Sequence, residues 1–481
     1  MYRTLLPAVL IAALASAPGA LAQGTYDVAA PPPQGFDRAA AQRDTRAHLT
    51  ALIALDTQNP PGNERRVAAY FDSVLRALPG VETRILDVGN GRANFIARLR
   101  ATRATKRPVL VMGHMDVVGA DSTKWDSPPF EATERDGYLY GRGAIDDKGP
   151  LAATVAALSQ LASQRDRLTR DVILLGTAAE EGGDVGIDWV VDSAYDLIRD
   201  AEFALNEGGR VRVRDGRIAT VNIQTTEKVP YSVVATARGP SGHGSVPLPD
   251  NALAALARAT ARVHDWRAPV RLNETTRLYF ARLATIEGDS AMRSAMQRLS
   301  AENADSATIA AAAAVLSREP LHNAVLRTAA SFTLLNGGHR SNVIPSEGSA
   351  TFNVRVLPGD DILAVVRRMQ EVGGEAQVTF ALAGTPGADP PPSPVTTDMF
   401  ASMERAAKAM APEVVVIPFM STGATDGAVL RARGIPTYGI LPFPLEMDSE
   451  LRMHGDNERV PVRALGWGAE YLYRVLQGVT R

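Results

Sequence analysis

Short, wholly apolar runs alternate with helix-like segments through the first half of this sequence. The runs at 109–112, 172–175 and 203–205 hold no polar residue, a pattern typical of strands buried on both faces of a sheet. Between the first two runs, Pro150 suits the first turn of a helix, and apolar residues then recur at near-helical spacing up to Leu161. Strands that alternate with helices in this way predict an α/β domain with a mostly parallel sheet.

The middle of the sequence has a different order of elements. Strand-like segments are expected at 231–238, 331–335, 349–356 and 377–382, and helical segments at 251–263 and 360–371. This order is β-α-β-β-α-β, which is the ferredoxin-like arrangement. An Ala-rich segment, roughly 265–328, separates the first helix from the second strand and is expected to be helical. A proline-rich linker at 390–394 then leads back to the first domain.

These patterns divide the chain into four regions. Residues 1–22 are expected to be a signal peptide, 23–228 the first part of the larger domain, 229–385 a smaller inserted domain with the helical insertion 265–328, and 386–481 the second part of the larger domain. The reading is one α/β domain that is interrupted by a smaller α/β domain.

The first 22 residues have the three parts of a secretory signal. Arg3 supplies the positive charge, residues 5–15 the apolar core, and Ala20-Leu21-Ala22 an A-x-A cleavage site. The alternative is a membrane anchor, but this run is too short to cross a hydrocarbon core of about 30 Å. We therefore expect an exported protein, periplasmic or secreted, that is not held by the membrane once the signal is removed.

The composition excludes several kinds of chemistry. The sequence contains no cysteine, so disulfides, thiolate metal sites and cysteine nucleophiles are ruled out. A net charge of −2 over 481 residues, without a basic stripe, gives no reason to expect a nucleic-acid partner. Any transition metal must be bound by histidine nitrogens and carboxylate oxygens.

Histidine and carboxylate side chains follow each of the three buried strands. They are His114, Asp116, Glu180, Glu181 and Glu207. Ligands in open α/β sheets bind at the carboxyl ends of the strands, so these groups are expected at one edge of the sheet. A glycine-rich turn at 140–149, ahead of a helix, adds Asp146 and Asp147. Such a set offers the oxygen and nitrogen donors that zinc takes when cysteine is absent.

The order of these motifs resembles the dizinc peptidase family of carnosinase, aminoacylase, acetylornithine deacetylase and succinyl-diaminopimelate desuccinylase. The matching elements are His114-x-Asp116, Gly141-Arg142-Gly143-Ala144-x-Asp146, Glu180-Glu181, Glu207 and Met453-His454-Gly455. The resemblance implies a zinc-exopeptidase-type, three-layer α/β catalytic domain with an inserted ferredoxin-like lid that also serves dimerisation. The helical insertion resembles the carboxypeptidase-like and acyl-amino-acid branch of that family.

The resemblance also implies roles for single residues. The metal ligands would be Asp146 as the bridge, His114 and Glu207 on one zinc, and Glu181 and His454 on the other. Asp116 would hold His114, the Asp146-Asp147 peptide would be cis, and Glu180 would act as the general base. Co²⁺ or Mn²⁺ could replace the two Zn²⁺ ions in each subunit.

Further residues are implied to contact the substrate. His243, in a glycine-rich loop of the lid, would donate to the carbonyl oxygen, and the family commonly uses this histidine across a homodimer. Asn342, Arg355 and Gly423 would hold a substrate carboxylate. The alternatives are that His243 lies in an ordinary flexible loop, Arg355 forms an ion pair at the domain boundary, and Asn342 caps a turn.

The expected function is hydrolysis of the amide bond next to a residue with a free carboxylate in small peptides, as a carboxypeptidase or dipeptidase does. Deacylation of N-acyl amino acids uses the same attack on an amide and stays open. A serine hydrolase is disfavoured because the sequence has no G-x-S-x-G elbow. A non-catalytic binding relative is also disfavoured, since every expected ligand and the base are present.

Overall fold

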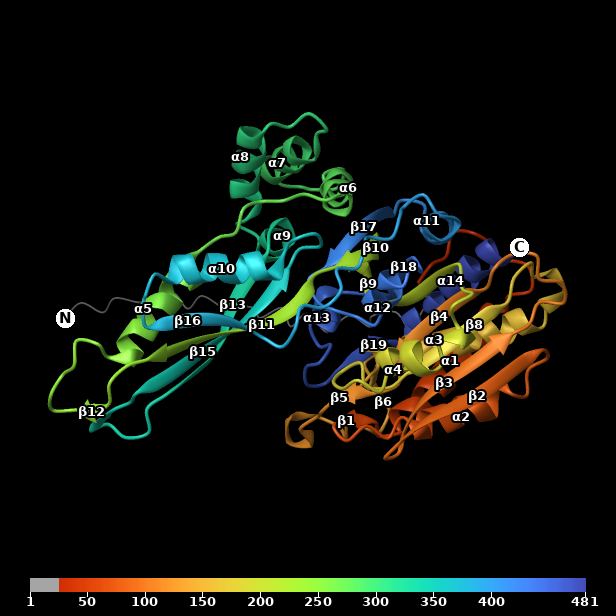
Figure 1. The fold of residues 1–481 in the computed structure, drawn as a ribbon. Helices are drawn as coiled ribbons and strands as arrows, with labels where there is room; N and C mark the ends of the chain where they lie inside the picture. The colour runs from red at the N-terminus through yellow and green to blue at the C-terminus, as the bar shows by residue number, and fades with distance from the viewer. Residues whose placement is uncertain (1–25) are drawn as a thin grey trace, which may run out of the picture.

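The computed structural model describes residues 26–481, so the expected signal peptide at 1–22 lies outside the described residues. The chain forms a large α/β body and a smaller, elongated body beside it, with a group of helices above their junction (Figure 1). The large body is built from both ends of the chain, which agrees with the order expected from the sequence. Within the described part of the chain, no helix is both long and apolar enough to cross a membrane.

An eight-stranded sheet forms the centre of the large body, in the order β17-β10-β18-β9-β4-β8-β3-β2. Its strands are β2 (Val81–Gly89), β3 (Arg92–Leu99), β4 (Val109–His114), β8 (Val172–Thr177), β9 (Phe203–Arg214), β10 (Arg217–Glu227), β17 (Val415–Ser421) and β18 (Thr437–Leu445). Neighbours β18, β9, β4 and β8 run parallel, so their carboxyl ends meet at one edge. The fully apolar runs are therefore the centre of the sheet, as the sequence predicts.

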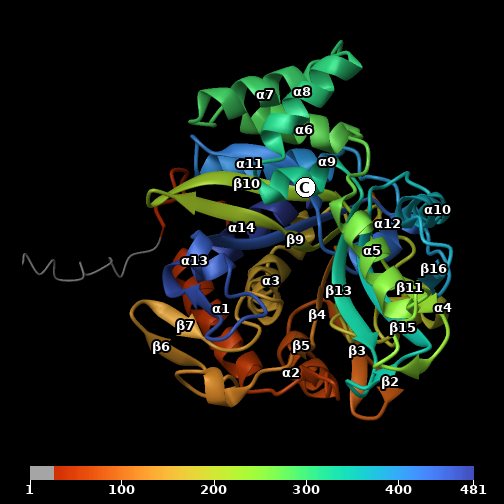
Figure 2. The same ribbon diagram turned by 90° about the vertical axis from the view of Figure 1, so that its left-hand side faces the viewer.

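Helices cover both faces of this sheet and make the body three layers thick (Figure 2). One face carries α1 (Arg38–Ile53), α2 (Arg65–Leu75), α3 (Lys148–Ala162), α11 (Asp398–Met410) and α14 (Val462–Thr480), and the other carries α4 (Ile187–Ser193) and α12 (Gly427–Ala432). In β4, Val109 and Val111 pack into the first layer, whereas Leu110 and Met112 pack into the second. This alternation explains why residues 109–112 of the strand are all apolar.

Short elements complete the large body. They are β1 (Gln58–Asn59), β5 (Val117–Val118), β6 (Thr133–Arg135), β7 (Tyr138–Tyr140), β19 (Arg459–Pro461), α13 (Met447–Glu450) and the 3-10 turns 122–124, 165–167 and 195–197. Strands β1 and β5 pair in parallel, and β19, β7 and β6 form a small antiparallel sheet.

Strand β9 is longer than the sequence analysis predicts. It continues past 205 to Arg214, where it pairs with β10 in an antiparallel hairpin. Its pairing with β18 shifts register between the pairs Asn206–Gly439 and Arg210–Leu441. Glu207 lies in this irregularity rather than after the end of a strand. Irregularities of this kind are common next to active sites because they change the direction of a side chain.

The smaller body has a four-stranded antiparallel sheet in the order β13-β15-β11-β16. Its elements are β11 (Val229–Arg238), α5 (Ala252–Asp265), β13 (Ala329–Gly337), β15 (Glu347–Val356), α10 (Ile362–Gly373) and β16 (Val378–Ala383). Helices α5 and α10 cover one face with an apolar core of their own. This is the ferredoxin-like lid that the sequence predicts, and a small ladder of β12 (Gly242–His243) and β14 (Val343–Ile344) extends from it.

The Ala-rich insertion is helical, as expected. It forms α6 (Glu274–Leu283), α7 (Ser290–Ser300), α8 (Ser306–Leu316) and α9 (Pro320–Leu326). These helices share an apolar core with Ile417, Phe419 and Met420 of β17, the edge strand of the large sheet. The insertion therefore covers that edge of the large sheet and lies above the junction with the lid (Figure 2).

Candidate active site

The acidic and histidine residues predicted from the sequence converge where the parallel strands end. His114 is the last residue of β4, and Glu180 and Glu181 follow β8 in the next loop. Asp146 ends the glycine-rich turn before α3, and His454 arrives from the C-terminal part of the chain after α13. The peptide between Asp146 and Asp147 is cis, as the resemblance implies.

The carboxylate of Asp146 lies between two imidazoles. One of its oxygens is 2.8 Å from Nε2 of His114, and the other is 3.0 Å from Nε2 of His454. Nε2 of His454 is also 3.0 Å from Oε1 of Glu181. A carboxylate that faces a different histidine with each oxygen fits the bridging role that the sequence resemblance implies for Asp146.

Two overlapping groups of side chains could each hold a metal ion. The groups are His114, Glu180 and Glu181, and Asp146, Glu181 and His454, each with ligand atoms within 4.8 Å of one another. Oε1 of Glu181 is buried and makes no well-formed hydrogen bond, although Nε2 of His454 lies 3.0 Å from it. Imidazoles with carboxylates are a donor set that zinc favours, so the residues fit the metal pair.

Glu207 is not a member of either group, and Glu180 takes its place beside His114. Glu207 is nevertheless close enough to Asp146 for the two charges to interact, and burial together with Asp146 raises the pKa of Glu207 well above its ordinary value. The structure thus assembles four of the five predicted ligands, and the ligand role of Glu207 stays a prediction.

Carboxylates are crowded into this site. Burial raises the pKa of Glu180 to about 10, and the charges of Glu207 and Asp426 act in the same direction. Burial opposes ionisation of Asp146, but hydrogen bonds from His114 and His454 lower its pKa. A surplus of buried negative charge favours the binding of cations, which would let these groups ionise.

Asp116 supports the loop that carries the two glutamates. Its carboxylate oxygens each accept a backbone N–H at 3.1 Å, one from Glu180 and one from Glu181. Nδ1 of His114 lies 3.0 Å from the main-chain oxygen of Asp116 and 3.5 Å from its carboxylate. The structure therefore places Asp116 beside His114, as expected, and adds a second role toward the glutamate loop.

Sequence analysis missed two polar residues in this region. Nδ2 of Asn59 donates to Asp116 at 2.8 Å and to the main-chain oxygen of Gly182 at 2.6 Å, which ties the glutamate loop to Asp116. Glu458, four residues after His454, is buried behind the turn that ends in Asp146. For Asn59, the two prolines that follow it were the only local sign of an unusual segment. For Glu458, a single acidic residue in a polar stretch gave no sign of a role in the site.

The residues expected to contact the substrate fall into two pairs. His243 lies on β12 at the end of the lid farthest from the catalytic domain (Figure 1), where its Nδ1 is 2.7 Å from Oγ of Ser245. Asn342 is beside it, since its main-chain oxygen accepts the N–H of Gly244 at 2.8 Å. Within one subunit both are therefore remote from the predicted metal site.

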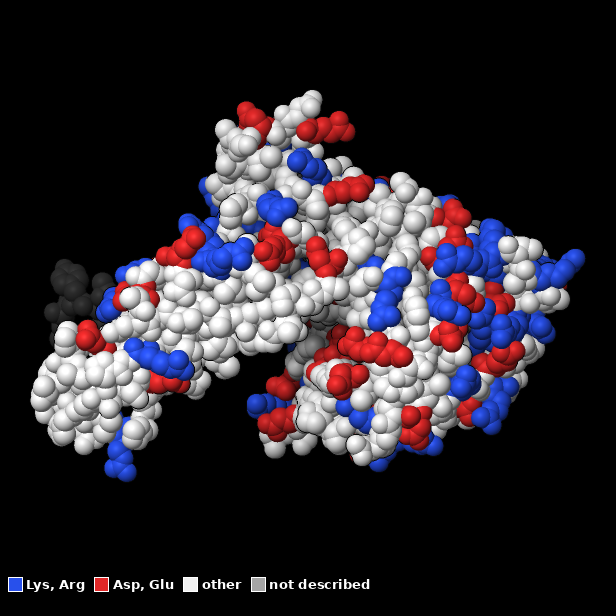
Figure 3. All heavy atoms as spheres, in the orientation of Figure 1, with Lys and Arg blue, Asp and Glu red and all other residues white. Residues whose placement is uncertain are grey.

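Arg355 and Gly423 lie at the opposite end, next to the junction of the domains. Arg355 pairs with Pro230 at the start of β11, and Gly423 follows β17, whose last residue accepts the N–H of Lys228 at 3.0 Å. Among residues 26–481 the Arg355 guanidinium has no carboxylate partner, and its Nε donates to Asn353 at 2.9 Å. The ion-pair alternative for Arg355 therefore finds no support. Figure 3 shows this face of the molecule hollowed between lid and catalytic domain.

A three-layer α/β domain with an inserted lid, and histidines and carboxylates clustered at the ends of its parallel strands, are the features of one class of hydrolases. Residues 110–478 match the family model described as Peptidase family M20/M25/M40. The chain belongs to this family.

Relatives and solved structures agree with that assignment. The chain is 25% identical over 387 residues to the human N-fatty-acyl-amino acid synthase/hydrolase PM20D1, covering 77% of this chain and 74% of the relative. It is 30% identical over 318 residues to a probable succinyl-diaminopimelate desuccinylase of Staphylococcus aureus, covering 65% and 67%. Its fold is similar to the M20 metallo-carboxypeptidase Sso-CP2 of Sulfolobus solfataricus, with a TM-score of 0.68 at 20% identity over 90% of this chain and 98% of the other. It is also similar to human carnosine dipeptidase 1, with a TM-score of 0.64 at 19% identity over 93% and 100%.

Proposed function

We propose that this chain is an exported dizinc hydrolase that cleaves the amide bond next to a residue with a free carboxylate in small peptides. The observation that carries the proposal is the Asp146 carboxylate between His114 and His454, with Glu180 beside the same cluster. The direct test is turnover of dipeptides by the mature chain loaded with zinc. Absence of turnover by folded, metal-loaded protein would favour a binding relative instead.

Zinc held at these groups would supply Lewis-acid activation of a water and of the substrate carbonyl. Glu180 accepts the proton of the attacking water and returns it to the leaving amide nitrogen, so that no free amide anion has to depart. Asp116 keeps Glu180 in place through the N–H groups of the loop. Positive charge nearby would oppose the rise in the pKa of Glu180 and leave its carboxylate free to accept a proton.

N-acyl amino acids are a second candidate substrate. The human relative is named an N-fatty-acyl-amino acid synthase/hydrolase, and such molecules also end in a free carboxylate. Dipeptides and N-acyl amino acids that share one C-terminal residue should be compared by kcat/KM. A preference of tenfold or more in either direction assigns the branch.

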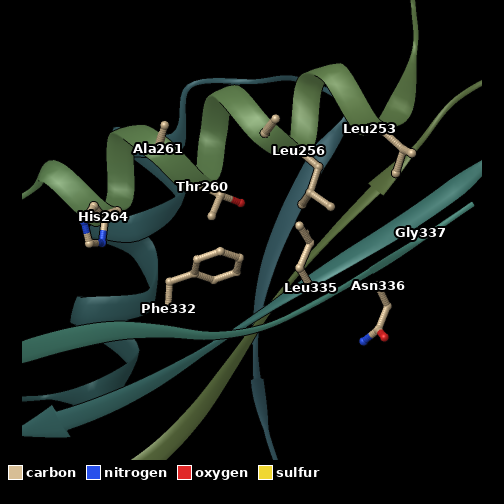
Figure 4. A pocket seen from close by; sticks show the side chains of 10 residues that line it. Leu253, Leu256, Thr260, Ala261, His264, Phe332, Leu335, Asn336 and Gly337 are labelled. Atoms are coloured by element: carbon tan, nitrogen blue, oxygen red, sulfur yellow. The ribbon is translucent and has the colours of Figure 1, made fainter.

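We propose further that the working unit is a homodimer joined through the lid. Strand β13 is the edge of the lid sheet, and Leu334 and Leu335 are 58% and 63% exposed there. A groove of about 540 Å³ lies beside it, between β13 and α5, and Leu256, Phe332 and Leu335 point into it (Figure 4). A free apolar strand edge with an apolar groove suits a second copy of the same edge.

This assembly would explain the position of His243. The histidine cannot reach the metal site of its own subunit from the far end of the lid, but a lid-to-lid dimer could carry it to the other subunit. Asn342 would accompany it, because the two are adjacent. The substrate site would then combine Arg355 and Gly423 of one subunit with His243 and Asn342 of the other.

Mixing two inactive variants tests this arrangement. His243→Ala should lose about 10²- to 10³-fold in kcat because a donor to the developing oxyanion is removed, and Glu180→Gln should be inactive for lack of its base. After dissociation and reassociation at equal amounts, half of the dimers are mixed and each has one intact site, so roughly a quarter of wild-type activity should return. Mixed dimers that form without any recovery would contradict the proposal. Leu335→Glu should give inactive monomers.

A further inference from the structure

Glu458 is a buried carboxylate that binds the backbone of the metal-site turn. Its side chain is 1% exposed. One oxygen accepts the N–H of Ile145 at 2.8 Å and that of Asp146 at 3.2 Å, and the other accepts the N–H of Gly143 at 2.9 Å. The second oxygen also accepts from Nη1 of Arg142 at 2.8 Å. Every donor therefore comes from the turn that ends in the bridging residue.

The same residue is joined to the segment of His454. Only three residues separate the two along the chain, and the main-chain oxygen of Glu458 accepts the N–H of Gly141 at 3.0 Å. Strand β19, which starts at the next residue, pairs with β7 just before the turn. Nη2 of Arg142 also approaches the main-chain oxygen of His454, at 3.5 Å.

These contacts fix the position of the segment that carries His454 relative to the turn that carries Asp146. Asp146 and His454 are 308 positions apart in the sequence, yet their side chains must meet within about 3 Å to share one site. A buried carboxylate is costly unless its oxygens are fully hydrogen-bonded. Glu458 obtains those bonds only when the turn has the conformation that presents Asp146, so the two segments are fixed relative to each other.

We propose that Glu458 is a positioning residue for metal binding, which sets the separation of Asp146 and His454 without contacting the ion. The inference rests on the proposed dizinc function. It predicts that the affinity for the ion held by Asp146, Glu181 and His454 depends on Glu458, although the donor atoms of that group are unchanged.

Glu458→Gln tests the proposal. The amide has the size of the carboxylate, but it lacks the negative charge that pairs with Arg142. It also turns an NH₂ group toward backbone N–H groups, which are themselves donors. Zinc affinity for the site formed by Asp146, Glu181 and His454 should fall about 10- to 100-fold, as for other groups that orient metal ligands. Competition with a chromogenic chelator measures it, and excess zinc should restore activity, which a general loss of fold would not allow.

Glu470→Gln is the matched control. Glu470 is equally buried, accepts from Arg38 and Arg474, and lies on α14. It should lower the melting temperature but leave both zinc affinities at wild-type values. If Glu458→Gln fails to fold, the zinc affinity of Glu458→Asp is measured instead. The shorter side chain keeps the negative charge but draws the carboxylate oxygens away from the turn. Wild-type zinc affinity in a folded Glu458 variant overturns the proposal, whereas a wild-type chain that binds no zinc refutes the dizinc function itself.

Discussion

Glu180→Gln should reduce kcat by about 10²- to 10⁴-fold while the protein still binds both zinc ions. The expected size of the loss is the usual contribution of general acid–base catalysis. Glu181→Gln should lose metal as well as activity, because Glu181 belongs to both metal-holding groups. Zinc content after dialysis and single-substrate kinetics on the two variants measure the difference.

The pair of variants also decides between two roles for Glu180. One of its carboxylate oxygens lies within 4.8 Å of ligand atoms of His114 and Glu181. The geometry alone therefore allows Glu180 to bind a metal in place of Glu207. Loss of one zinc from Glu180→Gln, with Glu207→Gln retaining both, would assign Glu180 as a ligand and leave the base unidentified. Normal turnover by Glu180→Gln would remove the residue from the mechanism altogether.

Amidation of the substrate's C-terminal carboxylate should remove most of kcat/KM. Arg355 is half-buried at the domain junction and has no carboxylate partner among residues 26–481, so its guanidinium is expected to bind the carboxylate of a substrate. Charge-assisted hydrogen bonds contribute about 1.5–3 kcal/mol each, so the loss should be roughly 10- to 100-fold or more. A free and an amidated dipeptide, compared under identical conditions, give the value.

Arg355→Lys should reproduce much of that loss, because an ammonium cannot form the planar, two-pronged contact of a guanidinium. Arg238→Lys is the control: it lies in the same sheet, on β11, and pairs with Glu347 at an exposed position, so it should be neutral. Equal rates on free and amidated substrates would contradict the carboxylate anchor and favour an aminopeptidase.

Parts of the fold could be predicted because the sequence signals were local. The unbroken apolar runs of β4 and β8 arise because both faces of the central strands are covered, and polar residues at the ends of such strands meet at one edge. The order of strands and helices in the lid was equally readable, since its alternating residues are buried on one face only. His114, Asp146 and Glu181 were thus expected together, whereas His454 was placed with them only by the resemblance to the dizinc peptidase family.

Other features depend on contacts that no local pattern contains. Strand β9 extends to Arg214 because it pairs with β10, and Glu207 owes its place to a register shift against β18. The insertion covers β17 because Ile417 and Phe419 offer it an apolar surface, which sequence spacing did not reveal. Glu458 and Asn59 act through hydrogen bonds to backbone groups distant in sequence, and such partners become visible only in the folded chain.

Activity measured against equivalents of zinc tests the central claim most directly. Metal-free mature protein should not hydrolyse a dipeptide or an N-acyl amino acid, and activity should rise as zinc is added and level off at two equivalents per subunit. Co²⁺ or Mn²⁺ should replace zinc with altered rates. Full activity without metal, or a plateau at one equivalent with the second ion having no effect, would contradict the dizinc mechanism.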